Sequence, residues 1–525
     1  MDNDQKIGNP DDARQKRELL KRLLLEENQR KQAKTAADSR TGLRFRERSG
    51  KQKFLPLSFG QEALWFIDRA NPGKAGYNSL LALELKGELD RAALYKAFAL
   101  LQQRHEVLRT CFVETDAAVA GNSEALLASE DNAQVRAVVR EQQELPIIEL
   151  DFSQSGDAYN QLETALQREA DTPFDLSQAP LYRVSLIKLS DADHRLILTV
   201  HHIISDGWST GVLYAELCAA YRAFAAGERV ALPPVLQYID YAIAQREFLT
   251  REVLEKQLDY WRQHLADASQ LALPRDRGYS AGTDYVGISK GRVIPGDLSK
   301  AIRALSRQQG TTVFVTVLAA FNLLMHRYSG QADIVIGTPL MVRSTPELEK
   351  VIGLLINMVV LRTQVQPDIS FESFLKSNRK TMLDAHDNGD LPFDYLVREL
   401  QPHRETNINP YFQVVFAQDM VASPVLHRQQ KDEKFSIQMQ AGGIASQSKA
   451  TRFDIEAYLR DWGDDLSIEF IFNKQLFDES TVDRMLDSFI RLLASAAAAP
   501  ERPISELSML GSEERHLLLE EWTRT

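Results

Sequence analysis

Helix-like and strand-like patterns alternate along residues 54–500, and this alternation limits the fold more than any other feature of the sequence. Stretches such as "DRAALYKAFALLQQRH" place apolar residues at the spacing of an amphipathic helix, whereas "LYRVSLIKL" and "HRLILTV" are typical of buried strands. The second half repeats the mixture, with a helical "FVTVLAAFNLLMHRYS" and strand-like "DIVIGTP", "NMVVLRTQV" and "DLSIEFIFN". The pattern predicts an α/β protein.

The length of 525 residues favours two folded lobes over one, because single cores stop growing near about 250–300 residues. Gly227 and the Pro233-Pro234 pair mark the break between the halves. We therefore expect an N-terminal lobe over 54–230 and a C-terminal lobe over 231–505. A hydrophobic content of 44% is enough for two such cores.

Residues 1–53 differ from the remainder. They hold fifteen Lys and Arg against nine Asp and Glu, which leaves a net charge of −17 on the rest of the chain. The stretch "DARQKRELLKRLLLEENQRKQ" reads as one helix with a short leucine stripe, followed by a polar linker up to Lys53. Two interpretations stay open, a solvated tail and a docking helix for a partner protein.

Composition narrows the function classes. Two cysteines, Cys111 and Cys218, make no disulfide framework, which fits a reducing compartment. No apolar run approaches the roughly 20 residues of a membrane span, and the N-terminus does not resemble a signal peptide. The acidic body argues against nucleic-acid binding. These features predict a soluble cytoplasmic protein that binds neither nucleic acid nor membrane.

The stretch "VHHIISDGWS", residues 200–209, places two of only ten histidines side by side. It follows a strand-like run, so His201 and His202 should point to opposite faces, and Gly207 allows a tight turn into the next helix. Three interpretations compete. The histidines could be satisfied core residues, metal ligands with Asp206, or a general base whose loop Asp206 shapes. No cluster of further metal ligands accompanies them.

This stretch matches the HHxxxDG signature of the condensation domains of nonribosomal peptide synthetases, which belong to the chloramphenicol-acetyltransferase-like superfamily. Other stretches resemble that family's motifs, in the family's order. They are "LSFGQEALWF" (57–66), "RHEVLRTCF" (104–112), "YIDYA" (238–242), "IGTPLMVR" (336–343), "IGLLINMVVLR" (352–362), "LPFDYLVREL" (391–400) and "NPYFQVVF" (409–416). The tail "LSMLGSEERHLLLEEW" resembles the linker to an adenylation domain, so we expect residues 506–525 to begin that linker.

The resemblance implies a V-shaped pseudo-dimer of two acetyltransferase-like lobes with a central active-site tunnel. It implies an acyltransferase that joins an acyl or peptidyl thioester donor to an aminoacyl thioester on an acceptor peptidyl carrier protein. The donor would arrive on a donor carrier protein or on CoA. Both substrates would ride on phosphopantetheine arms of partner proteins, so no cofactor or metal need bind this chain permanently. The product would be a natural product such as an antibiotic or a lipopeptide.

The resemblance also assigns residue roles. His202 is the catalytic histidine, either as a base or as the group that holds the amine, and His201 is structural. Asp206 faces away from the tunnel and pairs with an arginine, for which Arg343 is the candidate, while Gly207 leaves space for the pantetheine arm. Further residues expected to line the tunnel are Trp208, Ser209 and Asn357, although Trp208 suits core packing better.

Several functional alternatives remain at this point. The domain could elongate a peptide, or it could be a starter domain that attaches a fatty acyl group to the first amino acid. Because the chain begins with this domain, the donor should come from another molecule, and the basic residues 1–53 could dock an upstream synthetase. The aspartates of cyclising relatives are absent. A catalytically silent module that recruits partners is a further alternative, which the intact histidine motif disfavours.

Overall fold

The computed structural model describes most of the chain between Leu43 and Gly511. The described residues are 43–46, 48, 54–116, 133–141, 145–279, 286–401, 409–419, 430–431, 435–439, 451–463, 465–511 and 516. The docking helix expected within residues 1–53 and most of the linker expected at 506–525 lie outside them.

A six-stranded sheet forms the N-terminal lobe. Its strands, in spatial order, are β11 (Gln430–Lys431), β12 (Phe435–Met439), β1 (Asn78–Gly87), β6 (Asp193–His201), β5 (Tyr182–Ser190) and β4 (Ile147–Asp151). The helices α3 (Arg91–Arg104) and α5 (Gly207–Ala225) pack on one face, whereas α4 (Ala158–Asp171) covers the other. Alternate residues of β1 follow this division, because Leu83 contributes to the first core and Ala82 to the second.

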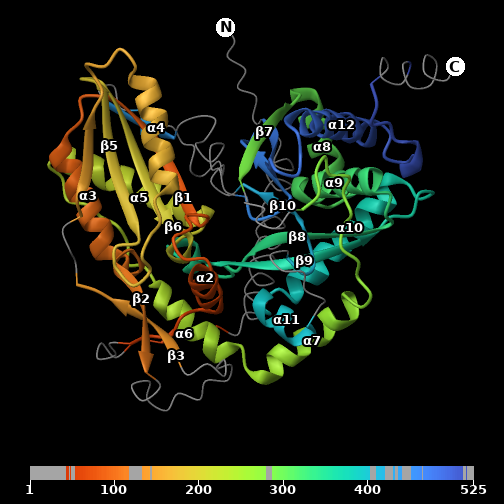
Figure 1. The fold of residues 1–525 in the computed structure, drawn as a ribbon, viewed down its shortest axis with the longest axis horizontal. Helices are drawn as coiled ribbons and strands as arrows, with labels where there is room; N and C mark the ends of the chain where they lie inside the picture. Colours follow the sequence, from red (N-terminus) through yellow and green to blue (C-terminus); the bar gives the residue numbers. More distant parts are fainter. Residues whose placement is uncertain are drawn as a thin grey trace, which may run out of the picture.

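A second six-stranded sheet forms the C-terminal lobe. Its strands, in spatial order, are β7 (Gly287–Ile294), β14 (Leu466–Asn473), β13 (Ile455–Asp461), β10 (Val414–Gln418), β8 (Asp333–Met341) and β9 (Ile356–Gln364). Among the helices that share its core are α8 (Gly296–Gln308), α9 (Val313–Ser329), α10 (Phe371–Asp387) and α12 (Glu479–Ala498). Figure 1 shows the two sheets in separate lobes.

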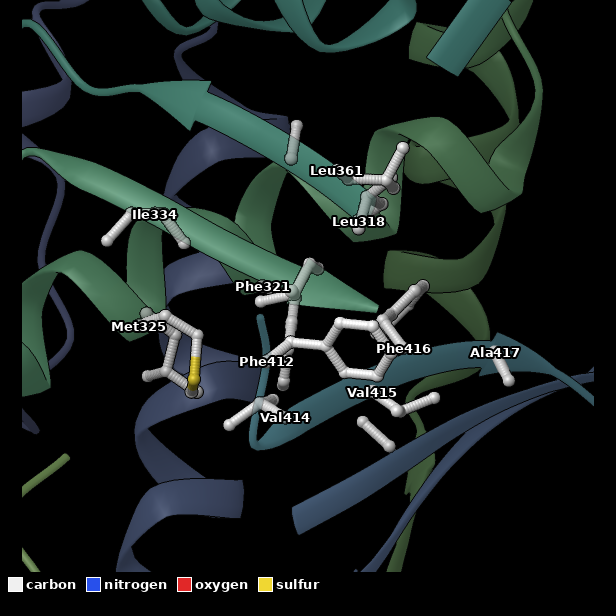
Figure 2. Close-up of a cluster of buried hydrophobic side chains, with 14 of the residues drawn as sticks. Leu318, Phe321, Met325, Ile334, Leu361, Phe412, Val414, Val415, Phe416 and Ala417 are labelled. Atoms are coloured by element: carbon white, nitrogen blue, oxygen red, sulfur yellow. The ribbon is translucent and has the colours of Figure 1, made fainter. Parts of the chain in front are cut away.

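The helix α9 is the centre of the second core. Its side chains are apolar almost all round, and those of Leu318, Phe321 and Met325 are fully buried against the sheet (Figure 2). Thr312 caps its first turn by accepting a hydrogen bond from a backbone N–H, and Gly330 ends it in the left-handed conformation. The caps explain why the helix begins and ends where the sequence pattern predicts.

The two lobes repeat one topology. In the first, β1 runs antiparallel to β6, β6 antiparallel to β5, and β5 parallel to β4. In the second, β7, β14, β13 and β10 follow in the same order with the same directions. Each series has a hairpin, β5–β6 or β13–β14, that leads into a long helix, α5 or α12. The lobes are therefore two versions of one α/β unit, which agrees with the expected pseudo-dimer.

The boundary expected at residue 230 does not separate the two cores. Buried side chains of α6 (Tyr238–Phe248) belong to the N-terminal core, as do those of residues 348–355 from the segment between β8 and β9. The strand β12 also pairs with β1 of the N-terminal sheet, although it lies late in the sequence. Each correction has the same cause, because the C-terminal half lends segments to the N-terminal lobe.

The remaining elements join or flank the sheets. They are α2 (Phe59–Ala70), the 3-10 turn η1 (Glu106–Arg109), the strand pair β2 (Thr110–Asp116) and β3 (Ala133–Val139), the turn η3 (His202–Ile204), α7 (Arg251–His264), the turn η4 (Leu348–Lys350), α11 (Phe393–Leu400) and the turn η6 (Ile504–Glu506). The helices α6 and α7 run from one lobe towards the other at the lower edge of Figure 1. In the described part of the chain, no single helix has the length and apolar composition to cross a membrane, and α8 with α9 meets the criteria only as a pair bent by 105°.

Candidate active site

The paired histidines lie where β6 ends and the chain turns into α5. The backbone N–H of His201 donates to the carbonyl of Leu181 at 3.0 Å, and that of His202 donates to the carbonyl of Tyr77 at 2.8 Å. The turn η3 then leads to Asp206, the residue that caps α5. These bonds fix both histidines on a rigid strand end, where α/β folds commonly carry reactive groups.

His201 points into the N-terminal lobe and is 3% exposed. Its Nδ1 accepts a hydrogen bond of 3.1 Å from the backbone N–H of Ile203, and the rings of Tyr77 and Phe174 lie beside it. Burial, with a smaller contribution from His202, lowers the pKa of His201 to about 3. A neutral histidine that accepts a backbone hydrogen bond holds the shape of the turn.

His202 is only half-buried, and its two ring nitrogens have different environments. Its Nδ1 lies 2.6 Å from the carbonyl oxygen of Ser205, which can only accept, so Nδ1 carries the proton. In the neutral ring Nε2 then has a free lone pair. Burial and the charge of Arg452 lower the pKa of His202, so the ring is neutral at pH 7. The side chain is therefore set up as a base at Nε2.

A buried ion pair supports the turn from behind. Nη2 of Arg343 lies 2.8 Å and 2.9 Å from the two carboxylate oxygens of Asp206, and both side chains are 1% exposed. Asp206 also accepts hydrogen bonds from the backbone N–H and hydroxyl of Ser209 and from the N–H of Leu355. These partners enclose the carboxylate away from solvent, so Asp206 holds the shape of the turn.

The same network connects the two halves of the chain. Arg343 follows β8, and its Nη1 donates to the carbonyls of Leu348 and Val351 at 2.7 Å each. These residues belong to the segment that packs in the N-terminal core. Removing one member of a buried, hydrogen-bonded charge pair typically costs about 3–5 kcal/mol. The turn that carries the paired histidines is thus held in place by the chain that follows β8.

Two residues expected to line the tunnel, Ser209 and Asn357, direct their polar groups to other parts of the chain. Ser209 is fully buried, and its hydroxyl bonds Asp206, Arg343 and the backbone of Gly353. Asn357 donates its two amide N–H groups to the carbonyls of Gly389 and Leu391, and its oxygen accepts from Phe393. The polar groups of both side chains are used within the protein.

Gly207 and Trp208 form the first turn of α5. Both are half-buried, so neither belongs fully to the core. The indole N–H of Trp208 donates to the carbonyl of Glu349 at 2.7 Å, which joins α5 to η4. The side-chain amide of Gln61 in α2 donates to the carbonyl of Ile203 in η3 at 3.2 Å. Hydrogen bonds to two other elements, η4 and α2, therefore hold this part of the chain.

Sequence reasoning missed two neighbours of His202. Tyr77 immediately precedes β1. Arg452 lies shortly before the first residue of β13, in the other lobe. The guanidinium carbon of Arg452 lies 5.4 Å from the centre of the Tyr77 ring. Neither residue lies in a motif that we used, and their proximity depends on how the lobes meet. A hint was present in the alternating polar residues of "TRFDIEAYLRD", which places a polar face on a buried strand.

The metal interpretation of the histidine pair has no support in the described part of the chain. No group of three or more His, Cys, Asp or Glu side chains there could hold a metal ion. His201 uses its Nδ1 within the turn, and Asp206 is enclosed by its own partners.

The chain belongs to the condensation-domain family, because the family model "Condensation domain" matches residues 51–519. Condensation domains form amide bonds. One of the linear gramicidin synthase proteins from Brevibacillus parabrevis is 38% identical over 90% of this chain, which spans 9% of that protein's length. Phosphinothricin tripeptide synthetase PhsC from Streptomyces viridochromogenes is 33% identical over 88% of this chain, which spans 41% of it. These findings confirm the family that the sequence motifs indicate.

Solved structures confirm the fold. The X-domain in its complex with OxyB from teicoplanin biosynthesis has a TM-score of 0.73 and 25% identity, over 89% of this chain and 98% of that one. The starter condensation domain of rhizomide synthetase RzmA has a TM-score of 0.71 and 17% identity, over 87% and 98% of the two chains. The V-shaped arrangement of two acetyltransferase-like lobes is thereby shown for this chain.

Proposed function

We propose that this chain catalyses amide-bond formation between an acyl or peptidyl thioester and an aminoacyl thioester on a peptidyl carrier protein. The observation that carries the proposal is the state of His202, whose Nδ1–H is held by the Ser205 carbonyl while Nε2 is left as a base. This arrangement lies on an intact HHxxxDG motif in a condensation-family chain.

The proposed reaction needs one proton acceptor and no redox step. The amine nitrogen of the acceptor attacks the carbonyl carbon of the donor thioester, forming a C–N bond, and Nε2 of His202 takes the proton that the amine loses. The tetrahedral intermediate then collapses, the C–S bond breaks, and the proton passes to the departing sulfur. The products are an amide on the acceptor arm and a free thiol on the donor arm.

Magnitudes indicate how the work is divided. A positioned base contributes about 10²–10⁴-fold, whereas holding two reactants in line can supply effective molarities of roughly 10⁵ M or more. A thioester is already an activated acyl group. His202 therefore adds a proton-transfer step to a reaction that depends mainly on alignment.

The partners follow from the chemistry. The acceptor is a peptidyl carrier protein, and the donor is a carrier protein or an acyl-CoA, each with its thioester on a phosphopantetheine arm. An upstream synthetase would dock through residues 1–53, and an adenylation domain would follow residues 506–525. Since both reacting groups arrive on partner molecules, the chain needs no permanently bound cofactor. The reaction takes place in the cytoplasm, where carrier-bound intermediates are made.

Peptide elongation and attachment of a first fatty acyl group differ only in the donor. We place elongation first, because the basic segment 1–53 suits a docked donor protein better than free acyl-CoA. A partner-recruiting module without chemistry is the second candidate. The likeness to an X-domain that was solved together with OxyB favours it, whereas the intact histidine motif opposes it.

The test is intact-protein mass spectrometry of an aminoacyl-loaded carrier protein after incubation with this protein and a donor. The donor is either a medium-chain acyl-CoA or an acyl-loaded carrier. His202→Ala is the variant, and His386→Ala, at a histidine whose side chain is 68% exposed, is its control.

We expect the acceptor mass to rise by the acyl group with the wild type and the control, and far more slowly with His202→Ala. Transfer from acyl-CoA identifies a starter domain, and transfer only from the donor carrier identifies an elongating one. Absence of His202-dependent transfer from either donor contradicts catalysis and leaves the recruiting module.

A further inference from the structure

Arg452 of the C-terminal lobe lies next to the catalytic turn of the N-terminal lobe. Its guanidinium carbon is 5.4 Å from the ring centre of Tyr77, and the carbonyl of Tyr77 accepts the backbone N–H of His202 at 2.8 Å. The charge of Arg452 also contributes to the lowered pKa of His202. The mechanism described above gives this cation no part.

The backbone of Arg452 is fixed, while its head group keeps spare donors. The buried carboxylate of Glu456 accepts from the backbone N–H of Arg452 at 2.9 Å, from the hydroxyl of Thr451 at 3.0 Å and from that of Tyr458 at 2.7 Å. The guanidinium itself is 3.7 Å from Glu456, which is an ion-pair distance longer than a hydrogen bond, and it donates one hydrogen bond to the hydroxyl of Tyr458. Five N–H donors outnumber these two contacts, and the side chain is 38% exposed.

The other arginine near the turn is not available to a substrate. Arg343 is 1% exposed, and its donors are used by Asp206, Ser209 and two backbone carbonyls. Among the described residues, Arg452 is the cation that lowers the pKa of His202. A positive group with free donors beside the base, and tethered by a buried carboxylate, is suited to receive a negative oxygen.

Attack of the amine on a thioester places a negative charge on the carbonyl oxygen. Donors aimed at that oxygen commonly supply a large part of the catalysis, and removal of one typically lowers kcat by about 10²–10³. We propose that Arg452 binds the carbonyl oxygen of the donor thioester and stabilises the oxyanion of the tetrahedral intermediate. This inference rests on the proposed amide-forming function and adds a second catalytic residue to it.

The test compares Arg452→Gln, Arg452→Lys and the control Arg292→Gln, which removes a cation of β7 that pairs with α12 instead. We expect kcat for acyl transfer to fall about 10²–10³-fold in Arg452→Gln with KM within threefold, because the bond forms in the transition state. Arg452→Lys keeps the positive charge but lacks the planar N–H donors of the guanidinium, so its kcat should fall about tenfold. Thermal unfolding verifies that each variant is folded.

The pH profile separates this role from a purely structural one. The groups that act on His202 are Arg452 and Asp206, with the neutral His201 beside it, while Asp394 and Glu456 act on the adjacent Tyr77. Loss of the Arg452 cation lets the pKa of His202 rise. The acid limb of kcat should therefore move to higher pH in Arg452→Gln, whereas in Arg452→Lys it should stay near that of the wild type.

The outcomes are distinguishable. If the wild type transfers no acyl group, the proposed function fails, and the role of Arg452 fails with it. If the wild type is active and Arg452→Gln keeps kcat within threefold of it, with or without a change in KM, the oxyanion role is wrong and the proposed function stands. If Arg452→Gln does not fold, Arg452→Lys decides between the two roles. A Lys variant with the kcat and the stability of the wild type would contradict hydrogen bonding of the guanidinium to the oxyanion.

Discussion

The turn that follows β6 and the turn that follows β14 are built on the same backbone plan, yet they differ in chemistry. In each lobe the hairpin's second strand ends at a buried polar residue, His201 or Asn473, which faces the first residue of the lobe's first strand. In each lobe two consecutive backbone N–H groups then donate hydrogen bonds. The N–H of the strand's last residue donates to the carbonyl just before the hairpin's first strand, and the N–H of the following residue donates to the carbonyl just before the lobe's first strand. The two turns thus have equivalent positions in the two lobes.

The equivalence extends to one side chain and then stops. Nδ1 of His201 accepts a hydrogen bond of 3.1 Å from the backbone N–H of the residue two positions later in the chain. Oδ1 of Asn473 accepts the equivalent hydrogen bond, at 2.9 Å. The next position holds His202 in one lobe and Lys474 in the other. A lysine cannot serve as a neutral base at pH 7 unless its pKa is greatly lowered, so only the first turn is equipped for proton transfer.

The aspartates at the N-cap positions of α5 and α12 also differ, because only the side chain of Asp206 accepts a capping hydrogen bond. Asp206 caps α5, is enclosed by Arg343 and bonds the backbone of Leu355. Asp478, at the start of α12, pairs with Arg277 on the surface, where both side chains are about half exposed. The chain after β8 covers the first turn and not the second. The comparison shows that a repeated scaffold acquires a site where a segment from the other lobe fixes the turn.

Replacing the equivalent residues His202 and Lys474 should give the largest difference. We expect His202→Ala to lower kcat for acyl transfer about 10²–10⁴-fold, since a positioned base contributes this much, and Lys474→Ala to leave it within twofold. Single-turnover transfer to the loaded acceptor measures both. An equal effect of the two changes would mean that the turns are not chemically distinct.

Replacing the two N-cap aspartates should change the stability of the protein by different amounts. Asp206→Ala leaves the Arg343 charge buried without its partner, which is expected to lower the free energy of unfolding by about 3–5 kcal/mol. Asp478→Ala removes a surface pair with Arg277 and should cost about 0–1 kcal/mol. Urea unfolding followed by circular dichroism compares them. Similar losses would show that the segment after β8 does not hold the histidine turn.

The stability of the wild type should fall in acid partly through His201. Its pKa is lowered to about 3 in the folded chain, against about 6.5 when unfolded, so between these values the unfolded state binds a proton that the folded state excludes. The contribution is full above pH 6.5 and is lost as pH falls towards 3. At pH 5 the loss is about 2 kcal/mol relative to pH 7. Urea unfolding at both pH values measures this loss. Between pH 7 and pH 5 the free energy of unfolding of His201→Asn should fall by about 2 kcal/mol less than that of the wild type. An identical fall in the variant would contradict this origin.

The smallest effect is expected from the exchange that the comparison suggests. His201→Asn installs the residue that performs the same task at Asn473, so the free energy of unfolding at pH 7 should change by about 1 kcal/mol or less. His201→Leu instead leaves the N–H of Ile203 buried without an acceptor and should cost about 1–3 kcal/mol. Thermal and urea unfolding decide the order of the two variants. A reversed order would refute the structural role of His201.

Much of the fold could be predicted from the sequence because it depends on local patterns. The helix α9 and the strands β5 and β6 lie where periodicity places them. The division of the lobes could not be predicted in this way. The strand β12 and the buried segment 348–355 belong to the N-terminal lobe through long-range pairing and packing, which no local pattern encodes.

The site shows the same limit. The histidine motif led to the turn, and the resemblance indicated the Asp206–Arg343 pair that the structure contains. It offered no means to tell that Ser209 and Asn357 use their polar groups to bond the protein backbone. Arg452 lies far from the motif in sequence and meets it only because the lobes pack against each other.

The claim that one of two equivalent turns presents a free imidazole nitrogen is tested most directly by nitrogen-15 NMR of the histidine rings, with His202→Ala used to assign the signal. At pH 7 we predict that His202 is neutral, with the proton on Nδ1 and none on Nε2. A charged ring, or a proton on Nε2, would contradict the assignment of His202 as the base.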